Sequence, residues 1–408
     1  MSRDPAVRRP AGSRSAAVAA VTVTTVGVLP VYLAGVLSVQ LRADLGFGPA
    51  LLGVLVATFF ATSAASSFTA GLMVRRWGPV AVVRLSAVVA GAALAAIALA
   101  ARDVLTLSAA LVAAGWANGV GQPASNDLIA RSVPPERQGL AYGLKQAAIP
   151  LATLLAGVGI PLIAIPFGWR WAFGLAAVLA LLVAVSVPGG GRLRPTASSA
   201  PSEAAGPFRR APLLVLAGGL LLGAATGNAL GAFFVASAVA EGIPPATAGV
   251  LAAVASIAGI GTRILIGWLA DRVRARWLLI VAAQMAVGGA AYALLGSGRE
   301  ALVAVGVIVG YCSGWAWAGL ATYAVARMHH GMAARATAIT QGGMGSGAAL
   351  GPLAFGAAAA ATSYSVAWYG TAVLSLLGAA VCVLGRSMLM RDRPALVAAQ
   401  QQRRGARA

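Results

Sequence analysis

The sequence predicts an all-α membrane protein with twelve transmembrane helices in two pseudo-symmetric six-helix halves. The first reason is composition, because the chain is 59% hydrophobic and 10% charged, whereas a soluble domain is about 25% charged. The second is that charges and turn residues divide the chain into about twelve apolar segments. Most of them approach the ~20 residues that a helix needs to cross a ~30 Å hydrocarbon core. The third is a loop motif that occurs twice, about 196 positions apart.

The apolar segments give the expected boundaries. A β-barrel would require alternating polarity, which these segments do not show. The first segment is too long for a signal peptide, so we expect an uncleaved first helix. The expected spans are 16–40, 50–72, 79–101, 104–130, 138–164, 170–188, 211–237, 245–270, 276–297, 300–326, 335–360 and 364–387. The expected parts are an N-terminal tail (1–15), a first half (16–188), a linker rich in Gly, Pro, Ser and Arg (189–210), a second half (211–387) and a C-terminal tail (388–408).

The basic residues predict the orientation. The net charge is +20, and most of the 30 Lys and Arg residues lie in the tails and in the loops on one side. The opposite loops hold only Arg42, Arg102, Arg170 and Arg299. The positive-inside rule therefore predicts that both termini are cytoplasmic, and it explains the charge without nucleic acid as a partner. The single lysine favours an arginine-rich bacterial proteome, so we expect a bacterial inner-membrane protein.

The repeated motif reads GWLADRVRAR at 267–276 and GLMVRRWGPV at 71–80. Gln146 and Gln341 align at nearly the same offset. An offset of nearly half the chain indicates two copies of one unit, which is typical of two-halved transporters.

These motifs, the sequence GWRWAF at 168–173 and the central linker together resemble the major facilitator superfamily (MFS) over essentially the whole chain. The resemblance implies a monomeric transporter that works by alternating access without a cofactor. It also implies a cytoplasmic gate, in which the motif's Asp lies at a helix N-terminus and pairs with nearby Arg. The residues matched to this gate are Gly71, Arg75, Arg76, Gly78, Asp127, Arg131, Gly267, Asp271, Arg272 and Arg276.

The first copy of the gate departs from the family pattern, because Arg75 stands where the motif has Asp. Asp127 is the acidic residue that falls inside a span, four positions before Arg131. This spacing favours an ion pair on one helix face. We interpret Asp127 as a partner of Arg75, Arg76 or Arg131, with a role as proton carrier as the alternative.

Two cations, Lys145 and Arg263, lie inside spans rather than in loops. Such a charge costs roughly 2.5–3.5 kcal/mol on insertion scales and is a functional hypothesis by default. The superfamily resemblance places the fifth and eighth helices together beside the central cavity, where two cations would suit an anion. The pattern Arg263-x-x-x-Gly267-x-x-x-Asp271 is also similar to monocarboxylate and oxalate/formate carriers, in which this Arg engages the substrate carboxylate. The alternative is that both side chains snorkel to the headgroups.

Polar and aromatic residues complete the expected substrate site. Asn118, Gln122 and Ser125 share one face of the fourth helix, and such a stripe is costly against lipid. The tenth helix carries Tyr311, Trp315 and Trp317 instead, either for the substrate or for ordinary packing. Together they favour a small organic anion as substrate. The further residues expected to supply hydrogen bonds are Tyr32, Gln146, Asn228 and Gln341.

Three other functions fit the sequence less well. A proton-coupled exporter of hydrophobic or cationic drugs is indicated by Gly347-x-x-x-Gly351-Pro352, but this motif lies in the eleventh helix rather than the fifth, and the acidic cavity is missing. A non-transporting sensor would carry an extra folded domain. An enzyme or a metal site would need a His, Cys, Asp and Glu constellation, which the spacing does not offer. The coupling partner, a proton or a counter-anion, stays open.

Overall fold

The computed structural model describes residues 11–134, 138–187, 210–273, 275–329 and 332–405, so the linker and the chain ends beyond these ranges lie outside the description. Every regular element in these ranges is helical. The first half comprises α1 (Ala11–Val36), α2 (Ser38–Leu45), α3 (Pro49–Ala100), α4 (Val104–Ser132), α5 (Gln138–Gln146), α6 (Ala148–Gly159), η2 (Ile160–Ala164), α7 (Ile165–Phe167) and α8 (Trp169–Ser186). The second half comprises α9 (Ala211–Ala240), α10 (Pro245–Arg272), α11 (Trp277–Leu295), α12 (Glu300–Val309), η3 (Gly310–Gly314), α13 (Ala318–Met328), α14 (Ala333–Ala361) and α15 (Tyr364–Gly405).

The number of membrane crossings depends on how α3 is counted. Eleven helical stretches in the described ranges are long and apolar enough to cross a membrane. One of them, α3, has 52 residues, and at 1.5 Å per residue it is far longer than a ~30 Å hydrocarbon core. Gly78 interrupts it with φ 80° and ψ 158°, and Pro79 follows. The chain therefore turns at Gly78 and crosses again, which gives twelve crossings and confirms the predicted all-helical fold.

Two crossings are interrupted rather than continuous. The crossing expected at 138–164 consists of α5, α6, η2 and α7, and the one expected at 300–326 consists of α12, η3 and α13. A π-helical turn in each, η2 and η3, gives the interruption a local cause, since such turns disturb the regular hydrogen-bond ladder. These interruptions matter for the site, because they leave backbone carbonyls outside the regular ladder.

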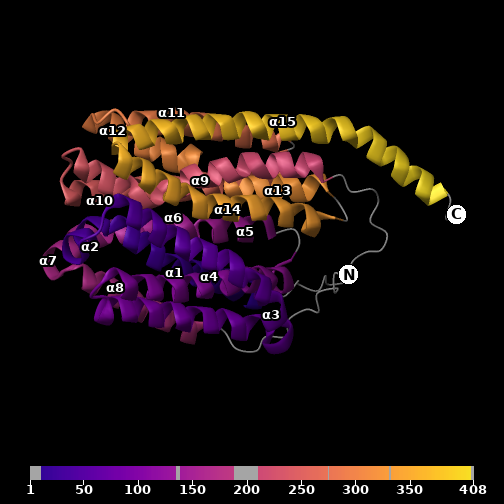
Figure 1. Ribbon diagram of the computed structural model, residues 1–408. Helices are drawn as coiled ribbons and strands as arrows, with labels where there is room; N and C mark the ends of the chain where they lie inside the picture. The colour runs from indigo at the N-terminus through magenta and orange to yellow at the C-terminus, as the bar shows by residue number, and fades with distance from the viewer. Residues whose placement is uncertain (1–10, 135–137, 188–209, 274, 330–331, 406–408) are drawn as a thin grey trace, which may run out of the picture.

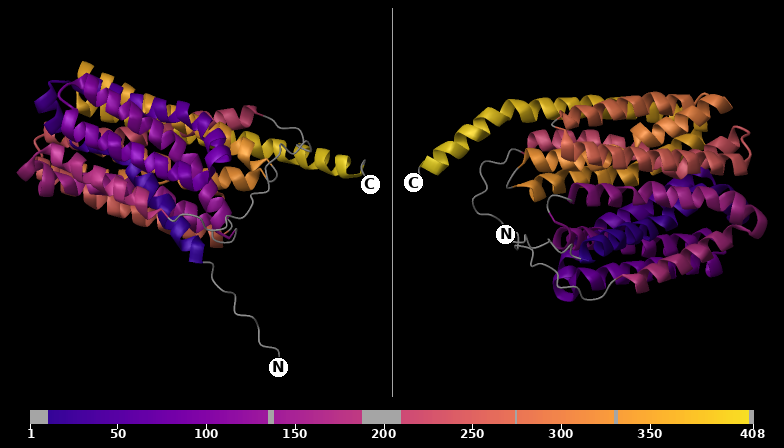
Figure 2. Two further views of the ribbon diagram at one scale, coloured as in Figure 1. Left: turned by 90° about the horizontal axis from the view of Figure 1, so that it is seen from below. Right: turned by 180° about the vertical axis from the view of Figure 1, so that it is seen from behind.

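The two halves form two layers, which Figure 1 shows as the indigo-to-magenta helices lying against the pink-to-yellow helices. The layers join where α1 packs on α9, α3 on α14, and both α5 and α6 on α10. The view from behind in Figure 2 shows the same division. On the α6–α10 pair the contact is backbone to backbone, since a Cβ on Gly157 would lie 2.7 Å from the Gly249 carbonyl oxygen. Small residues allow this close approach.

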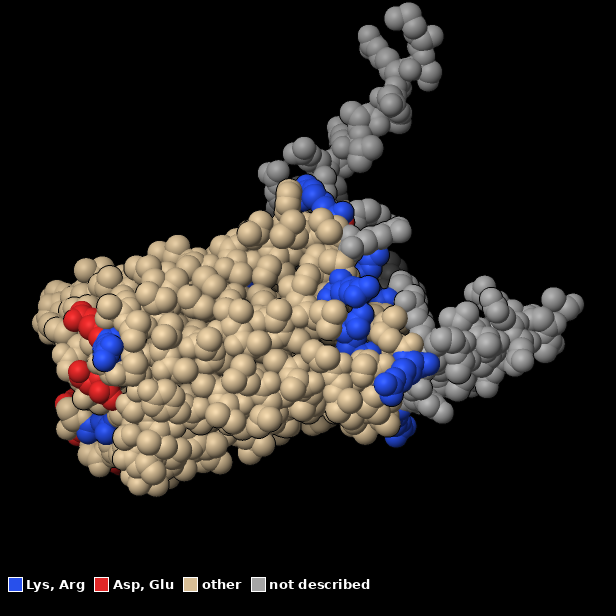
Figure 3. Space-filling model, turned by 90° about the horizontal axis from the view of Figure 1, so that it is seen from above, with Lys and Arg blue, Asp and Glu red and all other residues tan. Residues whose placement is uncertain are grey.

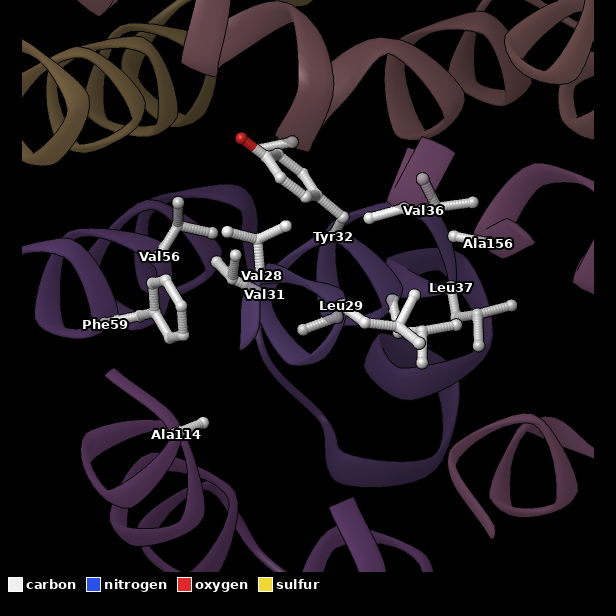
Figure 4. Close-up of a cluster of buried hydrophobic side chains, with 14 of the residues drawn as sticks. Val28, Leu29, Val31, Tyr32, Val36, Leu37, Val56, Phe59, Ala114 and Ala156 are labelled. Carbon is white, nitrogen blue, oxygen red and sulfur yellow. The ribbon is translucent and has the colours of Figure 1, made fainter. Parts of the chain in front are cut away.

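The core of the first half surrounds α1. Figure 4 shows Val28, Leu29 and Val31 packed among side chains of neighbouring helices, while Tyr32 points away from them toward the second half. Tyr32 is only 2% exposed. A polar hydroxyl therefore reaches the interface between the layers from an otherwise apolar helix face.

Charge separates the two ends of the bundle. Figure 3 shows Lys and Arg gathered at one end and a mixture of acidic and basic residues at the other, with an uncharged surface between them. We call these the basic end and the mixed-charge end. The basic end includes Arg75, Arg76, Arg131, Arg272 and Arg276, and the mixed-charge end includes Asp44, Arg102, Asp103, Arg170, Glu241 and Glu300.

Candidate functional site

Arg263 reaches from α10 to the facing half. Its guanidinium Nη1 donates a hydrogen bond to the Gln146 carbonyl at 2.8 Å, and Nη2 donates to the Trp315 carbonyl at 2.6 Å. Its Cζ also lies 5.5 Å from the centre of the Trp315 ring. The side chain is only 6% exposed. The guanidinium therefore turns into the protein and meets neutral acceptors there.

Lys145 is held in a similar way on the first half. Its ammonium donates to the Asn126 side-chain oxygen at 2.5 Å and to the Gln122 carbonyl at 3.1 Å, both on α4. Lys145 is 4% exposed. Gln146, the residue after Lys145, supplies the carbonyl that Arg263 uses, so both cations are anchored around the end of α5.

Neither cation has a carboxylate partner among the described residues. The ion pair found in this part of the chain joins Asp127 to Arg131 at 2.7 Å, on one face of α4. Both side chains of that pair are about a quarter exposed. Two buried positive charges are therefore balanced by dipoles alone, and an ammonium or guanidinium gains most from an anionic acceptor.

An amide network lies beside Lys145. Asn118 donates to the Ser63 hydroxyl at 2.8 Å, and Gln122 donates to the Asn118 side-chain oxygen at 3.3 Å. Ser125 is fully buried and donates to the Gln122 carbonyl. The polar stripe expected on the fourth helix thus faces protein and links α4 to α3.

An aromatic cluster lies on the other side of Arg263. The Trp315 ring makes edge contacts with Tyr32 and Tyr311, at centroid distances of 5.5 and 5.3 Å. The Tyr32 hydroxyl donates to the Asn228 side-chain oxygen at 3.1 Å. Trp317 instead donates its indole N–H to the Gly314 carbonyl and packs in the second half. Tyr32, Asn228, Tyr311, Trp315 and Arg263 therefore form one buried cluster between the layers.

The hydrogen bond between Tyr32 and Asn228 joins equivalent positions of the two halves. The two residues are 196 positions apart, which is the offset of the repeated loop motif. Positions that a pseudo-two-fold axis exchanges can touch only where they lie next to that axis. This hydrogen bond therefore marks the centre of the molecule.

Gln341 and Gln146 lie in different surroundings. Gln341 is exposed on α14, and its amide donates to the Thr322 hydroxyl at 3.4 Å. Gln146 contributes its backbone carbonyl to Arg263. Its side chain lies against Gly319, where a Cβ would meet the Gln146 Cγ at 3.4 Å. The structure thus brings Gln146 into the cluster and leaves Gln341 on the α13–α14 contact.

The gate motifs lie at the basic end. Gly71, Arg75 and Arg76 are exposed where the first crossing of α3 ends, and Gly78 makes the turn. Arg272 stacks over the Trp268 ring at 4.1 Å. Arg276 directly precedes α11.

Asp271 differs from the expected placement at a helix N-terminus. It is the penultimate residue of α10, because that helix continues through Arg272. Within the described ranges Asp271 forms no ion pair. Its motif instead brings helices together at Gly267, where a Cβ would lie 3.7 Å from the Gly143 Cα.

The contacts reveal residues that the sequence did not assign. Ser63 anchors Asn118, and Asn126 accepts from Lys145. Pro150 lies four positions after Gln146 and determines which carbonyl is available. In the described residues no group of three or more His, Cys, Asp or Glu is arranged to hold a metal ion.

Comparison with known proteins agrees with this architecture. No curated protein matches the chain. Two solved structures of a bacterial homologue of the human lysosomal transporter Spinster, in inward-facing occupied and unoccupied conformations, align with it at TM-scores of 0.72 and 0.73. In each case the identity is 17%, and the alignment covers 94% of this chain and 99% of the other. The sequence profile of the Major Facilitator Superfamily matches twice, at residues 16–240 and 215–407. The chain therefore belongs to the Major Facilitator Superfamily and is a multi-pass membrane transport protein, not an enzyme.

Proposed function

We propose that the protein moves a small organic anion across a bacterial inner membrane by alternating access, with Lys145 and Arg263 as the residues that bind it. The observation that carries the proposal is that both cations are buried without a carboxylate partner among the described residues. Burial of an unpaired charge is costly, and an incoming anion lowers that cost. An anionic substrate would thus complete the site.

Both cations keep donors to spare. An arginine has five N–H donors and a lysine three. The hydrogen bonds of Arg263 use two nitrogens, and those of Lys145 go to two acceptors. Arg263 in particular has the planar fork that suits a carboxylate. The remaining donors can therefore make the first contacts with substrate oxygens.

The neighbouring side chains favour an organic substrate. Amides from Asn118 and Gln122 lie beside Lys145, whereas Trp315, Tyr32 and Tyr311 lie beside Arg263. Ligand sites commonly combine apolar walls with a few polar groups. A drug exporter for cations would instead be served by acidic residues, and Asp127 is already paired with Arg131. A proton or a counter-anion would couple the transport, and a monomer would suffice for it.

The basic end supports the orientation that we propose. Its Arg residues, shown in Figure 3, would face the cytoplasm under the positive-inside rule. Both termini would then be cytoplasmic, since α1 begins at that end and α15 runs toward it (Figure 1).

Uptake into proteoliposomes tests the proposal. Purified protein would be assayed with a panel of radiolabelled mono- and dicarboxylates, and wild type compared with Lys145→Gln and Arg263→Gln. We expect each variant to lose at least tenfold in uptake, because a charged hydrogen bond contributes about 1.5–3 kcal/mol. Arg299→Gln serves as the control, since Arg299 is exposed at the mixed-charge end. Normal carboxylate uptake by both buried-site variants would disprove the anion site.

A further inference from the structure

Arg263 binds the first half at the Gln146 carbonyl, which has no hydrogen-bond donor at the usual position in the helix of Gln146. In an α-helix the carbonyl of residue i accepts from the N–H of residue i+4. The residue four positions after Gln146 is Pro150, which has no N–H. Accordingly α5 ends at Gln146 and α6 begins at Ala148. The carbonyl that Pro150 leaves without its usual donor is the one that Arg263 contacts at 2.8 Å.

The second acceptor of Arg263 has a similar origin. Trp315 lies between η3 and α13, with φ −126° and ψ −15°, outside both helical segments. Its carbonyl accepts from Nη2 at 2.6 Å. One guanidinium therefore binds the carbonyls of two interrupted crossings, one in each half.

Of these two bonds, only the bond to Gln146 crosses between the halves. The same interface is also held nearer the mixed-charge end, by the Thr153–Ser256 hydrogen bond at 2.8 Å and by the Gly157–Gly249 approach. Because α10 runs from the mixed-charge end to the basic end, Arg263 holds the side of this interface closer to the basic end. Loss of its bond would free that side first.

We propose that Pro150 positions the Gln146 carbonyl so that Arg263 latches the two halves together toward the basic end, and that an anionic substrate opens this latch by competing for the guanidinium. The second part rests on the proposed function. A carboxylate bound by both arms of the guanidinium is a stronger acceptor than two neutral carbonyls. A ligand shifts a conformational equilibrium by its differential affinity for the two states. Exchange of Gln146 for the substrate supplies that difference.

The latch is tested first without substrate. Spin labels at Leu140→Cys on α5 and Met328→Cys at the end of α13 report the separation of the halves, since both positions are exposed. The background carries Cys312→Ser and Cys382→Ser, and distances are measured by double electron–electron resonance in lipid nanodiscs. We expect Arg263→Gln to shift the population to longer distances, with about a tenfold change in the ratio of the two states. Pro150→Ala should shift it in the same direction, because the restored N–H competes for the Gln146 carbonyl.

Pro166→Ala is the matched control. Pro166 is exposed on α7 and its i−4 residue, Leu162, is 64% exposed. This variant should leave the distances unchanged. The latch is refuted if Arg263→Gln and Pro150→Ala both match the background, or if Pro166→Ala shifts the distances as much as Pro150→Ala.

The substrate arm separates this inference from the proposed function. A transported carboxylate should shift the background toward longer distances and should cause no further shift in Arg263→Gln. Transport of a carboxylate with no change in distance would overturn the opening step and leave the proposed function standing. If no carboxylate is transported but the two variants still shift the distances, the proposed function fails, the latch stands, and its opening by an anion is overturned.

Discussion

Removal of the Tyr32 hydroxyl tests whether the hydrogen bond at the centre of the molecule holds the two halves together. Tyr32→Phe keeps the ring and its edge contact with Trp315 at 5.5 Å, and deletes only the donor to Asn228. Asn228 keeps its other bond, to the Ala224 carbonyl at 2.8 Å. The substitution therefore isolates one interhelical hydrogen bond.

The expected loss of stability is that of one hydrogen bond between membrane helices. Interhelical hydrogen bonds in membrane proteins contribute about 0.6 kcal/mol on average and at most about 1.7 kcal/mol. This corresponds to about a 3- to 20-fold change in an equilibrium constant. We expect a coupling energy within this range from a double-mutant cycle of Tyr32→Phe and Asn228→Leu, measured by reversible unfolding in SDS-containing mixed micelles.

The chain supplies a matched control for this cycle. Tyr292 is fully buried, but its hydroxyl has no hydrogen-bond partner among the described residues. Tyr292→Phe should therefore cost no stability, since it removes an unsatisfied polar group. A coupling energy within about 0.3 kcal/mol of zero would refute the reasoning. An equal loss in Tyr292→Phe would also refute it, because the effect would then come from the hydroxyl's burial and not from its bond.

Two further predictions concern a packing contact and a helix cap. Gly157→Ala should destabilise the protein by about 1–3 kcal/mol through overpacking, because its Cβ would lie 2.7 Å from the Gly249 carbonyl oxygen, whereas Gly159→Ala on the same helix meets nothing within 4 Å; equal unfolding midpoints for the two variants would contradict this. The backbone N–H and hydroxyl of Thr106 hold the pKa of the Asp103 carboxyl below its ordinary value, so the cap stabilises α4 above the unfolded pKa and is lost as the pH falls through the folded pKa. Asp103→Ala should flatten the pH dependence of unfolding below about pH 4, and an unchanged profile would exclude the carboxylate as its source.

The sequence predicts the architecture well because its signals are local or repeated. The lengths of the apolar runs predict the twelve crossings. The Gly78-Pro79 pair explains how α3, although assigned as one helix, turns back and crosses twice. The positions of Lys145 and Arg263 within spans were also evident from the apolar runs, whereas the choice between burial and snorkelling was not. These features depend on length and composition, which a single chain displays directly.

The partners of those cations could not be predicted in the same way. Arg263 meets Gln146 only because α10 packs against α5, and that register is set by contacts such as Gly143 with Gly267. Helical spacing predicts that Asn118 and Gln122 share one helix face. It does not predict that the Lys145 ammonium reaches Asn126. One sequence signal was nonetheless available. Pro150 removes the donor for a carbonyl four residues earlier, which marks Gln146 as an acceptor.

Symmetry explains where a functional difference can arise in a duplicated protein. Tyr32 and Asn228 occupy equivalent positions and meet at the centre, so their bond serves both halves alike. Lys145 and Arg263 aligned in sequence with Thr340 and Ser67, so neither has a basic equivalent. Ser67 on α3 occupies the position equivalent to Arg263 on α10. The α5–α10 interface therefore has an arginine bond between the halves, and the equivalent α3–α14 interface has no arginine at that position to form one. The broken symmetry thus distinguishes the two interfaces, and an anion that engages Arg263 would act on one of them.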